Sequence, residues 1–498
     1  MTVGDDGAAG ARREVNRRRC TDLAAYGALV TVIFVVYRGV FGIYFLNEDF
    51  SWLWRCRLVA PTTIWTLLTR DVMGGLYSWR PVLQLSFGLN EAIWGVDPIG
   101  YRAAAMAWQA LAAGALYAIV SRVADQWRGG LAALFFAVHP MHVESLGWTC
   151  AGGGPISTAL LLLALLGYLA WRHNRDRRGR DRLGRDRHGR GLWMVLVPFA
   201  LALATLESSL VFVALVLTLD VFLPAPAMRL GRRLQLYAGL FAVLVAFLWL
   251  RHASSGAAMD MNLVGFDSRW QLSVVQFLAF VLHKLQAMAA MLLTFEQQPD
   301  WVTSSIALAL ILAAAACWWR GRWLGLWGVM WIVVAGAPFT VLLMGPFPRH
   351  LHLATVGVGL LFAELLATLA ELIARRTRQL AMVCATGLMV LWLGQMVRRI
   401  DHTTAELTER GRVGAALLQD LHRLVPAPPP GSELAFYGTG DLRAHQHVFV
   451  YGFDDAVRLL YDDGSLRVHL GPRGSAPQAT YQLSYADGRL ALLSDDRS

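Results

Sequence analysis

The sequence has little charge and almost no lysine. Only 16% of its 498 residues are charged, and Lys284 is the single lysine. Soluble domains carry about 25% charged residues. Hydrophobic residues make up 56% of the chain, and they gather in blocks of about 20, the length that crosses the hydrocarbon core of a bilayer. The composition therefore excludes an ordinary soluble protein and predicts an integral membrane protein.

Cysteine is also scarce. None of the five cysteines forms a pair at metal-ligand spacing, so neither a disulfide framework nor a zinc site is expected. One bridge, between Cys56 and Cys150, stays open as an alternative if both face an oxidising compartment. The first apolar block, residues 23–46, is too long for a signal peptide and lacks a small-residue cleavage site, so we expect a retained transmembrane helix.

The net charge of +10 is clumped, and the clumps indicate orientation rather than nucleic acid binding. Arginine clusters fall between alternate apolar blocks, and the longest lies at residues 172–190. Because short basic loops remain cytoplasmic, the amino terminus is predicted inside and the carboxyl terminus outside. The eleven expected spans are 22–46, 101–120, 130–147, 155–171, 191–206, 209–223, 234–250, 302–319, 323–344, 352–373 and 379–397.

One further apolar stretch, residues 271–294, carries His283 and Lys284 near its middle and would break the alternation of the arginines. We expect it to form a helix on the outer surface or a partly re-entrant segment. In that place Lys284 becomes a candidate contact for a phosphate group.

The chain is predicted to be an all-α polytopic membrane protein with a small C-terminal α+β domain outside the membrane. Residues 434–437, 447–451, 466–470, 480–485 and 490–493 resemble strands, and Asp463-Gly464 and Asp487-Gly488 resemble hairpin turns. Three arginine-rich pentads in residues 175–189 predict a solvated loop that anchors the topology or attracts anionic lipid. The expected parts are a basic cytoplasmic segment 1–21, a transmembrane domain 22–400 with a first outer loop 47–100 and an arginine-rich cytoplasmic loop 172–190, a helix and proline-rich linker 401–431, and the outer domain 432–498.

Polar residues collect at the predicted outer ends of the spans. Charged side chains near the hydrocarbon region are costly, so they are functional candidates. Carboxylates, histidines and arginines at one membrane face predict chemistry on an anionic amphiphile. The candidates are Glu48, Asp49, Arg80, His139, His142, Glu144, Trp148, Glu207, Arg349 and His352.

The order of these motifs resembles the GT-C polytopic glycosyltransferases, especially the protein O-mannosyltransferase-related and tetratricopeptide-linked transmembrane groups. An acidic pair follows the first helix, and Arg80-Pro81 begins an amphipathic stretch. Next come His-Pro-x-His-x-Glu at 139–144 and Arg-x-Leu-x-Leu at 349–353. The resemblance covers roughly residues 20–400 and is most specific between Trp79 and Trp148. No tetratricopeptide repeat is recognisable in the tail.

This resemblance implies transfer of a hexose, mannose being the first guess, from a polyprenyl-phosphate sugar at the outer face, with inversion. Asp49 is then the expected base and Glu48 the second choice. Arg80 and Arg349 would bind the phosphate, with His139, His142 and His352 as further donors and Glu144 orienting one of them. Trp148, Glu207 and Lys284 are weaker candidates for contacts with the sugar, a neighbouring cation and the phosphate.

The expected partners are membrane lipid, the lipid-linked sugar and a protein or glycan acceptor, with no nucleic acid. No residue pattern indicates a metal ion or other cofactor besides the donor substrate. The expected location is a bacterial cytoplasmic membrane, with the outer domain in the periplasm or outside the cell. Two other functions stay open, namely a transporter or flippase for a lipid-linked saccharide and a non-catalytic membrane scaffold.

Overall fold

The protein is described as a computed structural model. The description covers residues 5–73, 79–173, 188–222, 230–255, 273–341, 347–374, 378–438, 448–449, 451–472, 475–476, 478–486 and 488–495. Most of the predicted arginine-rich loop, residues 174–187, lies outside the described residues.

Within these described ranges, eight helices are long and apolar enough to cross a membrane, against eleven predicted spans. The predicted span 130–147 is instead α6 (Gln126–Ala137) and the short α7 (His142–Gly147), separated at His139 and Pro140. Proline lacks an amide hydrogen and interrupts the helix there. The eight helices are α1 (Asp5–Val36), α5 (Pro98–Val123), α8 (Gly153–His173), α11 (Leu230–Ser255), α14 (Val274–Thr294), α15 (Asp300–Trp319), α16 (Trp323–Gly336) and α17 (Thr355–Ala374).

Residues 271–294, expected to form a surface or partly re-entrant helix, include α14. This is a continuous helix of 21 residues that is long and apolar enough to cross a membrane. Ser273 caps its amino end by accepting a hydrogen bond from the Gln276 amide. Whether α14 lies on the surface or spans the membrane stays a prediction.

The centre of the helical part is formed by α5, α6, α8, α16 and α17. Helices α16 and α17 approach closely because small residues face each other. A Cβ on Gly357 would lie 2.5 Å from the Gly328 carbonyl oxygen. Such small-residue contacts are typical of helix packing in membranes, where the hydrophobic effect does not drive helices together.

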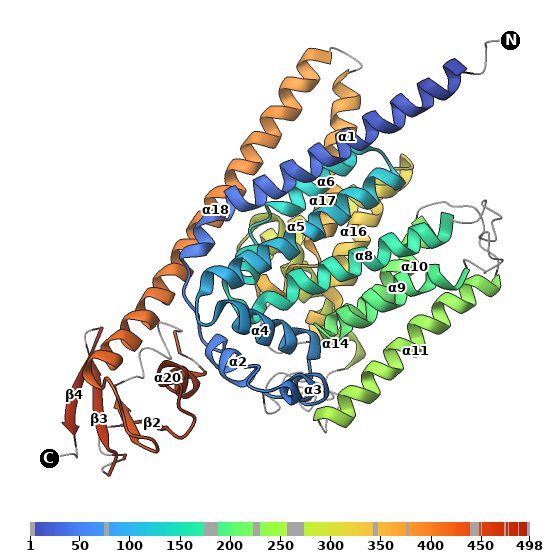
Figure 1. Ribbon diagram of the computed structural model, residues 1–498. Helices are drawn as coiled ribbons and strands as arrows, with labels where there is room; N and C mark the ends of the chain where they lie inside the picture. The colour runs from blue at the N-terminus through green and yellow to red at the C-terminus, as the bar shows by residue number, and fades with distance from the viewer. Residues whose placement is uncertain are drawn as a thin grey trace.

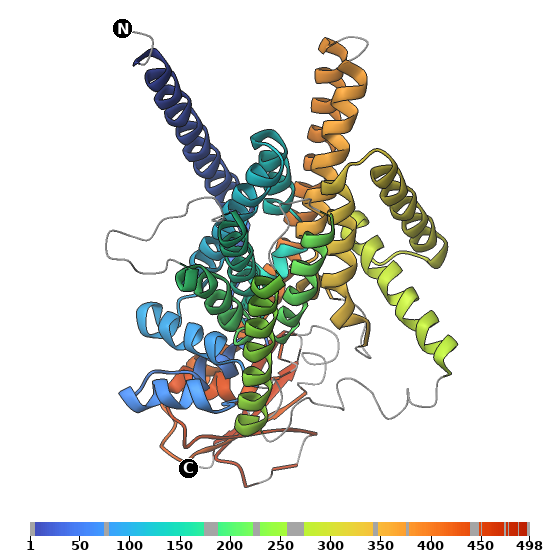
Figure 2. The same cartoon turned by 90° about the vertical axis from the view of Figure 1, so that its right-hand side faces the viewer.

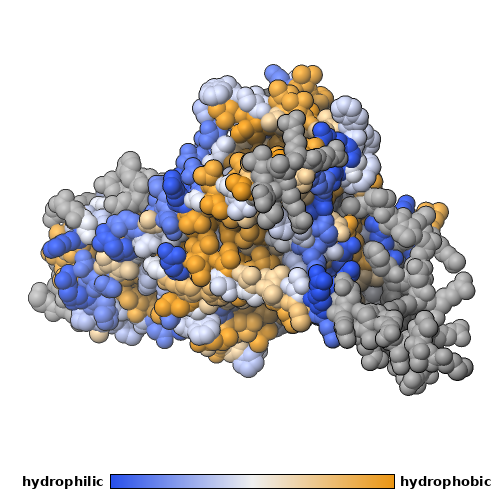
Figure 3. Space-filling view, turned by 90° about the horizontal axis from the view of Figure 1, so that it is seen from above, coloured by the Kyte–Doolittle hydropathy of each residue, from blue (hydrophilic) through white to orange (hydrophobic). Residues whose placement is uncertain are grey.

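Two short helices, α9 (His188–Leu203) and α10 (Phe212–Phe222), pack beside this centre. Large apolar side chains remain on the outside of the molecule, among them Phe241 and Trp249 of α11 and Leu308 and Ile311 of α15. Figure 3 shows extended hydrophobic surface over the helical part. This is the surface that a surrounding bilayer would cover.

The first outer loop forms three short helices at the end of the molecule opposite the N-terminus (Figure 1). They are α2 (Asp49–Arg55), α3 (Pro61–Thr69) and α4 (Pro81–Trp94). Short 3-10 turns complete the connections at η1 (Arg38–Gly42), η2 (Thr149–Gly152), η3 (Glu207–Val211), η4 (Ala337–Val341) and η5 (Pro348–Leu351).

The last span and the following amphipathic helix, predicted as separate elements, form one helix of 47 residues, α18 (Arg378–Leu424). It leads into the C-terminal domain, which lies at the same end of the molecule as α2–α4 in both views (Figures 1 and 2). One helix therefore leads from the membrane part to the short proline-rich segment, residues 425–431, that precedes the C-terminal domain.

Among its described residues, the C-terminal domain is a small mixed sheet with one helix, in agreement with the predicted α+β class. The strands are β1 (Glu433–Tyr437), β2 (Arg467–Gly471), β3 (Tyr481–Ala486) and β4 (Arg489–Asp495), in the order β2-β1-β3-β4. Strand β1 pairs in parallel with β2 and β3, and β3 pairs antiparallel with β4. The turn at Asp463-Gly464 is not a hairpin, because it joins α20 (Phe453–Tyr461) to β2.

Candidate active site

The acidic loop, residues 46–49, connects η1 to α2 and brings Asp49 against η2. The Asp49 side chain is completely buried. Its Oδ2 accepts hydrogen bonds from the amides of Leu46 (3.1 Å) and Thr149 (3.3 Å), and its Oδ1 accepts one from Cys150 (2.7 Å). Burial raises the pKa of Asp49 to about 6, against the opposing effects of Arg102 and these three amides. Asp49 therefore fixes the loop to η2.

Glu48, the other carboxylate of the pair, keeps 9% of its surface exposed and precedes the first residue of α2. Its carboxylate lies 4.0 Å from the Cys150 sulfur. Cys150 is within electrostatic range of Arg80 and Arg349 as well. Glu48 therefore lies beside Cys150, and Arg80 and Arg349 lie in the same region of the molecule.

Arg80 stands immediately before α4 and binds Glu207 through two nitrogens. Its Nε and Nη2 lie 3.0 Å from the Glu207 carboxylate oxygens. Arg251, on α11, contacts the same carboxylate at 3.0 Å. Sequence reasoning missed Arg251, although an arginine directly after an apolar block was the available signal. Two guanidinium groups from distant helices therefore share one carboxylate.

Arg349 belongs to η5 and lies between aromatic rings. Its guanidinium carbon is 4.8 Å from the centre of the Trp148 ring and 4.4 Å from that of Phe347. Glu144 accepts a hydrogen bond from the Arg349 backbone amide (3.3 Å) and forms an ion pair with its side chain (3.5 Å). These contacts fix the position of the Arg349 guanidinium group. Its ion pair with Glu144 is not fully buried, because both side chains are partly exposed.

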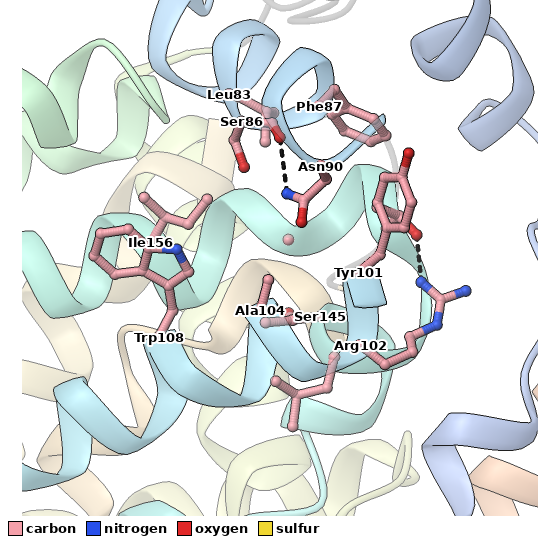
Figure 4. Close-up of a pocket in the computed structure, with 14 residues that line it drawn as sticks. Leu83, Ser86, Phe87, Asn90, Tyr101, Arg102, Ala104, Trp108, Ser145 and Ile156 are labelled. Carbon is pink, nitrogen blue, oxygen red and sulfur yellow. Dashed lines mark hydrogen bonds between the residues drawn. The ribbon is translucent and has the colours of Figure 1, made fainter. Parts of the chain in front are cut away.

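A second buried cation, Arg102, lies behind the acidic loop and was also missed. It donates to the Tyr44 carbonyl oxygen (3.1 Å) and to the Thr149 hydroxyl group. Figure 4 shows Arg102 beside Tyr101 at one end of a mostly apolar cleft, with Trp108 and Ile156 at the other end. The cleft is narrow and lies between α4, α5, α7 and α8. Arg102 therefore supports the backbone on both sides of Asp49.

The three predicted histidine ligands lie elsewhere, in the protein core. His139, His142 and His352 are at most 1% exposed. Gln109 links two of them, since its Nε2 lies 2.7 Å from Nδ1 of His142 and its Oε1 lies 3.0 Å from Nε2 of His352. The other two ring nitrogens face Thr355 (2.8 Å) and Thr158 (3.0 Å). Neutral imidazoles satisfy every bond in this network.

His139 is satisfied in the same way, because Nε2 faces the Leu292 carbonyl oxygen at 3.0 Å and Nδ1 accepts from the Met141 amide. All three histidines are thus buried with partners inside the protein, which favours a structural role over the expected contact with phosphate. The His-Pro-x-His spacing turns both rings inward, toward α17 and α14. Lys284 lies on α14, where its described contact is the ring of Phe280 at 5.6 Å.

If the histidine network is structural, Gln109→Leu should lower the free energy of unfolding by about 2–4 kcal/mol, because it leaves two buried imidazole nitrogens without partners. The measurement is the unfolding midpoint in detergent. Gln126→Leu is the control, since it removes one partly exposed hydrogen bond from the Gln126 side chain to Asp22. It should lower the free energy of unfolding by less than Gln109→Leu does. If Gln109→Leu left the stability unchanged and weakened the binding of polyprenyl phosphate, the histidines would instead belong to the substrate site.

The cysteines and metal-ligating groups add no further site to this region. All five cysteines are free. Across the part of the chain that the structure describes, no three His, Cys, Asp or Glu side chains lie close enough together to hold a metal ion. The candidate groups are instead a largely buried carboxylate, Glu48, and two arginines, Arg80 and Arg349, each paired with a glutamate.

Solved structures confirm the predicted GT-C-like polytopic fold. ArnT from Cupriavidus metallidurans, bound to undecaprenyl phosphate, matches 93% of this chain and 97% of its own chain with a TM-score of 0.52 and 13% identity. The oligosaccharyltransferase AglB from Archaeoglobus fulgidus, in complex with an inhibitory peptide and a dolichol-phosphate, matches 90% of this chain and 64% of its own, with a TM-score of 0.51 and 13% identity. At this identity the likeness concerns the fold alone.

Among curated proteins, the chain is similar to protein O-mannosyl-transferases. Tmtc1 of Drosophila melanogaster is 29% identical over 164 residues, which are 31% of this chain and 19% of that protein. Human TMTC2 is 34% identical over 121 residues, 22% of this chain and 14% of that protein. The matched segment thus spans less than a fifth of these relatives. No model of a protein family matches the chain.

Proposed function

We propose that this protein is a membrane glycosyltransferase that moves a hexose, with mannose as the first candidate, from a polyprenyl-phosphate sugar to a hydroxyl group of an acceptor at the outer face. The observation that carries the proposal is the set of charged side chains in this region, with Glu48 beside Cys150, Arg80 held by Glu207 and Arg349 held by Glu144. A carboxylate and two guanidinium groups are what such a transfer needs. The names of the similar O-mannosyl-transferases and the lipid phosphates bound by ArnT and AglB support it.

Of the two acidic residues, Glu48 is better placed to act as the base than Asp49, the first choice from sequence. Both oxygens of Asp49 already accept amide hydrogens, and the side chain has no exposed surface. An acceptor hydroxyl group could not reach it without breaking the loop. Glu48 keeps 9% of its surface exposed whereas Asp49 has none, so we assign Glu48 the role of accepting the hydroxyl proton. Asp49 positions Glu48 by fixing the loop.

In the proposed step the acceptor oxygen forms a bond to the anomeric carbon on the face opposite the phosphate. The bond between that carbon and the phosphate oxygen breaks, its electron pair leaves with the polyprenyl phosphate, and the hydroxyl proton passes to Glu48. This direct displacement inverts the anomeric centre. Arg80 and Arg349 stabilise the charge that develops on the leaving phosphate, since guanidinium groups bind phosphate oxygens in pairs.

The experiment that tests the function is a transfer assay with the purified full chain in liposomes. The probes are radiolabelled mannosyl-phosphoryl-polyprenol and a cell-envelope fraction as acceptor. We expect label to move to acceptor material with release of polyprenyl phosphate. Movement of intact donor between leaflets without transfer would identify a flippase. Neither transfer nor movement would favour a scaffold, and both outcomes contradict the proposal.

Transfer should fall as the pH is lowered through about 6, without loss of thermal stability. Burial raises the pKa of Asp49 to about 6, so the folded protein takes up this proton more readily than the unfolded chain. The contribution of Asp49 to the free energy of unfolding therefore rises as the pH falls through 6. Protonation of the Asp49 carboxylate nevertheless weakens the hydrogen bonds that it accepts from the three backbone amides, and the acidic loop becomes looser. The check is to measure kcat and the unfolding midpoint over the same range, pH 5 to 8. The value of kcat should fall toward low pH while the midpoint does not.

A further inference from the structure

The C-terminal domain touches the acidic loop directly, although about 400 residues separate them along the chain. The Asn47 amide donates a hydrogen bond to the Val448 carbonyl oxygen at 3.1 Å. At the second residue of α2, the ring of Phe50 lies 5.5 Å from that of Phe449. Asn47 and Phe50 flank the Glu48-Asp49 pair, so the C-terminal domain contacts the chain on both sides of the pair.

The closest approach is at Gly452, the residue before α20. A Cβ at this position would lie 2.9 Å from the Asn47 carbonyl oxygen and 2.9 Å from the Ser51 hydroxyl oxygen. Gly452 has a φ of +80°, a conformation that glycine adopts at little cost. Only glycine therefore allows the start of α20 to rest on the acidic loop.

An ion pair strengthens the same contact one turn further along. Asp455 is 1% exposed and lies 3.1 Å from Arg55 of α2 and 3.0 Å from Arg458 of its own helix. A buried carboxylate of this kind is costly unless its partners are present. Docking of α20 on α2 thus provides one of the two charges that Asp455 requires.

The acidic loop needs such support, because its own conformation is unfavourable. Asn47 has a φ of 45°, in the left-handed region that residues other than glycine rarely occupy. Residues in such conformations persist only when their surroundings hold them there. Asp49 supplies contacts from the membrane side, and the C-terminal domain supplies the contacts to Asn47 itself.

We propose that the C-terminal domain is a positioning element for the acidic pair, in which the docking of α20 on α2 holds Glu48 in its reactive place. Gly452 and Asp455 are the positioning residues. This inference rests on the proposed function for its catalytic meaning. It also gives the outer domain a way to control transfer, because any ligand that displaces α20 would release the loop that carries Glu48.

The test is Gly452→Ala in the full chain, compared with Gly488→Ala. Gly488, in the β3–β4 turn of the same domain, has a φ of +78°, but a Cβ there would meet nothing within 4 Å. Both variants thus carry the same backbone strain, and only one disturbs the docking. We expect Gly452→Ala to lower kcat about tenfold or more with an unchanged KM for the donor, because Arg80 and Arg349 lie on other elements. Gly488→Ala should behave like the parent protein.

Hydrogen exchange supplies a readout that does not depend on activity. In Gly452→Ala the amides of residues 46–52 should exchange faster by about tenfold, whereas Gly488→Ala leaves them unchanged. Arg55→Met is a second variant, in case the first does not fold; it removes one partner of Asp455 and leaves Arg458, and it should raise the same exchange rates. If the parent protein transfers no sugar, the proposed function fails while this measurement still decides the docking. Exchange and kcat equal to those of Gly488→Ala would overturn the inference.

Discussion

Replacing Glu48 with glutamine should lower kcat for sugar transfer by about 10²–10⁴, the usual contribution of a general base. Glutamine has the same shape but cannot accept the proton of the acceptor hydroxyl. Donor binding should be unchanged, because the predicted phosphate contacts belong to Arg80 and Arg349. The measurement is kcat with saturating lipid-linked sugar, together with the dissociation constant for polyprenyl phosphate.

Asp49→Asn is the informative comparison, because it separates a chemical role from a positioning role. An asparagine places an amide NH₂ where one carboxylate oxygen accepts from the backbone amides of Leu46 and Thr149 or from that of Cys150. Two donors then face each other, and the free energy of unfolding should fall by about 1–3 kcal/mol. A fully stable Asp49→Asn protein without transfer, beside an active Glu48→Gln protein, would reverse our assignment.

The general character of the protein could be predicted from sequence, because the cost of polar groups in a membrane leaves a strong pattern. Long apolar blocks predicted a helical membrane protein, and the structure has eight helices among its described residues that are long and apolar enough to cross a membrane. The direction in which a side chain points is a different matter. His139 and His142 follow a helix end as surface ligands would, yet the break at Pro140 turns both rings into the core.

The elements that sequence reasoning missed depend on contacts between distant segments. Arg102 looks like an isolated charge in an apolar span, and its partners, Tyr44 and Thr149, lie about 50 residues away on either side. Arg251 meets Glu207 only because α11 packs near η3. Which of Glu48 and Asp49 is the better candidate for the base likewise depends on which carboxylate faces η2. The backbone conformation at Asn47, rather than the identity of either acidic residue, bears on that choice.

The second large effect concerns the phosphate. Arg80→Met should weaken binding of polyprenyl phosphate by about 10–100-fold, since a charge-assisted hydrogen bond contributes about 1.5–3 kcal/mol. Folding should survive, because Glu207 keeps Arg251 as an ion-pair partner. Arg80→Lys should restore only part of the affinity, since a lysine cannot make the paired contact of a guanidinium group. Binding of polyprenyl phosphate to the purified protein in nanodiscs provides the measurement.

Arg57→Met is the control. The Arg57 side chain is 25% exposed and lies 3.1 Å from Glu91, while that of Arg80 is 22% exposed and lies 3.0 Å from Glu207. Arg57 also pairs with Asp462 of the C-terminal domain, as Glu207 also pairs with Arg251. Both arginines belong to the first outer loop, so both changes remove one positive charge from the same face of the protein. An equal loss of affinity in the two variants would mean that the phosphate responds to overall charge. A loss confined to Arg80→Met would place the lipid phosphate at the junction of α4, η3 and α11, close to Glu48.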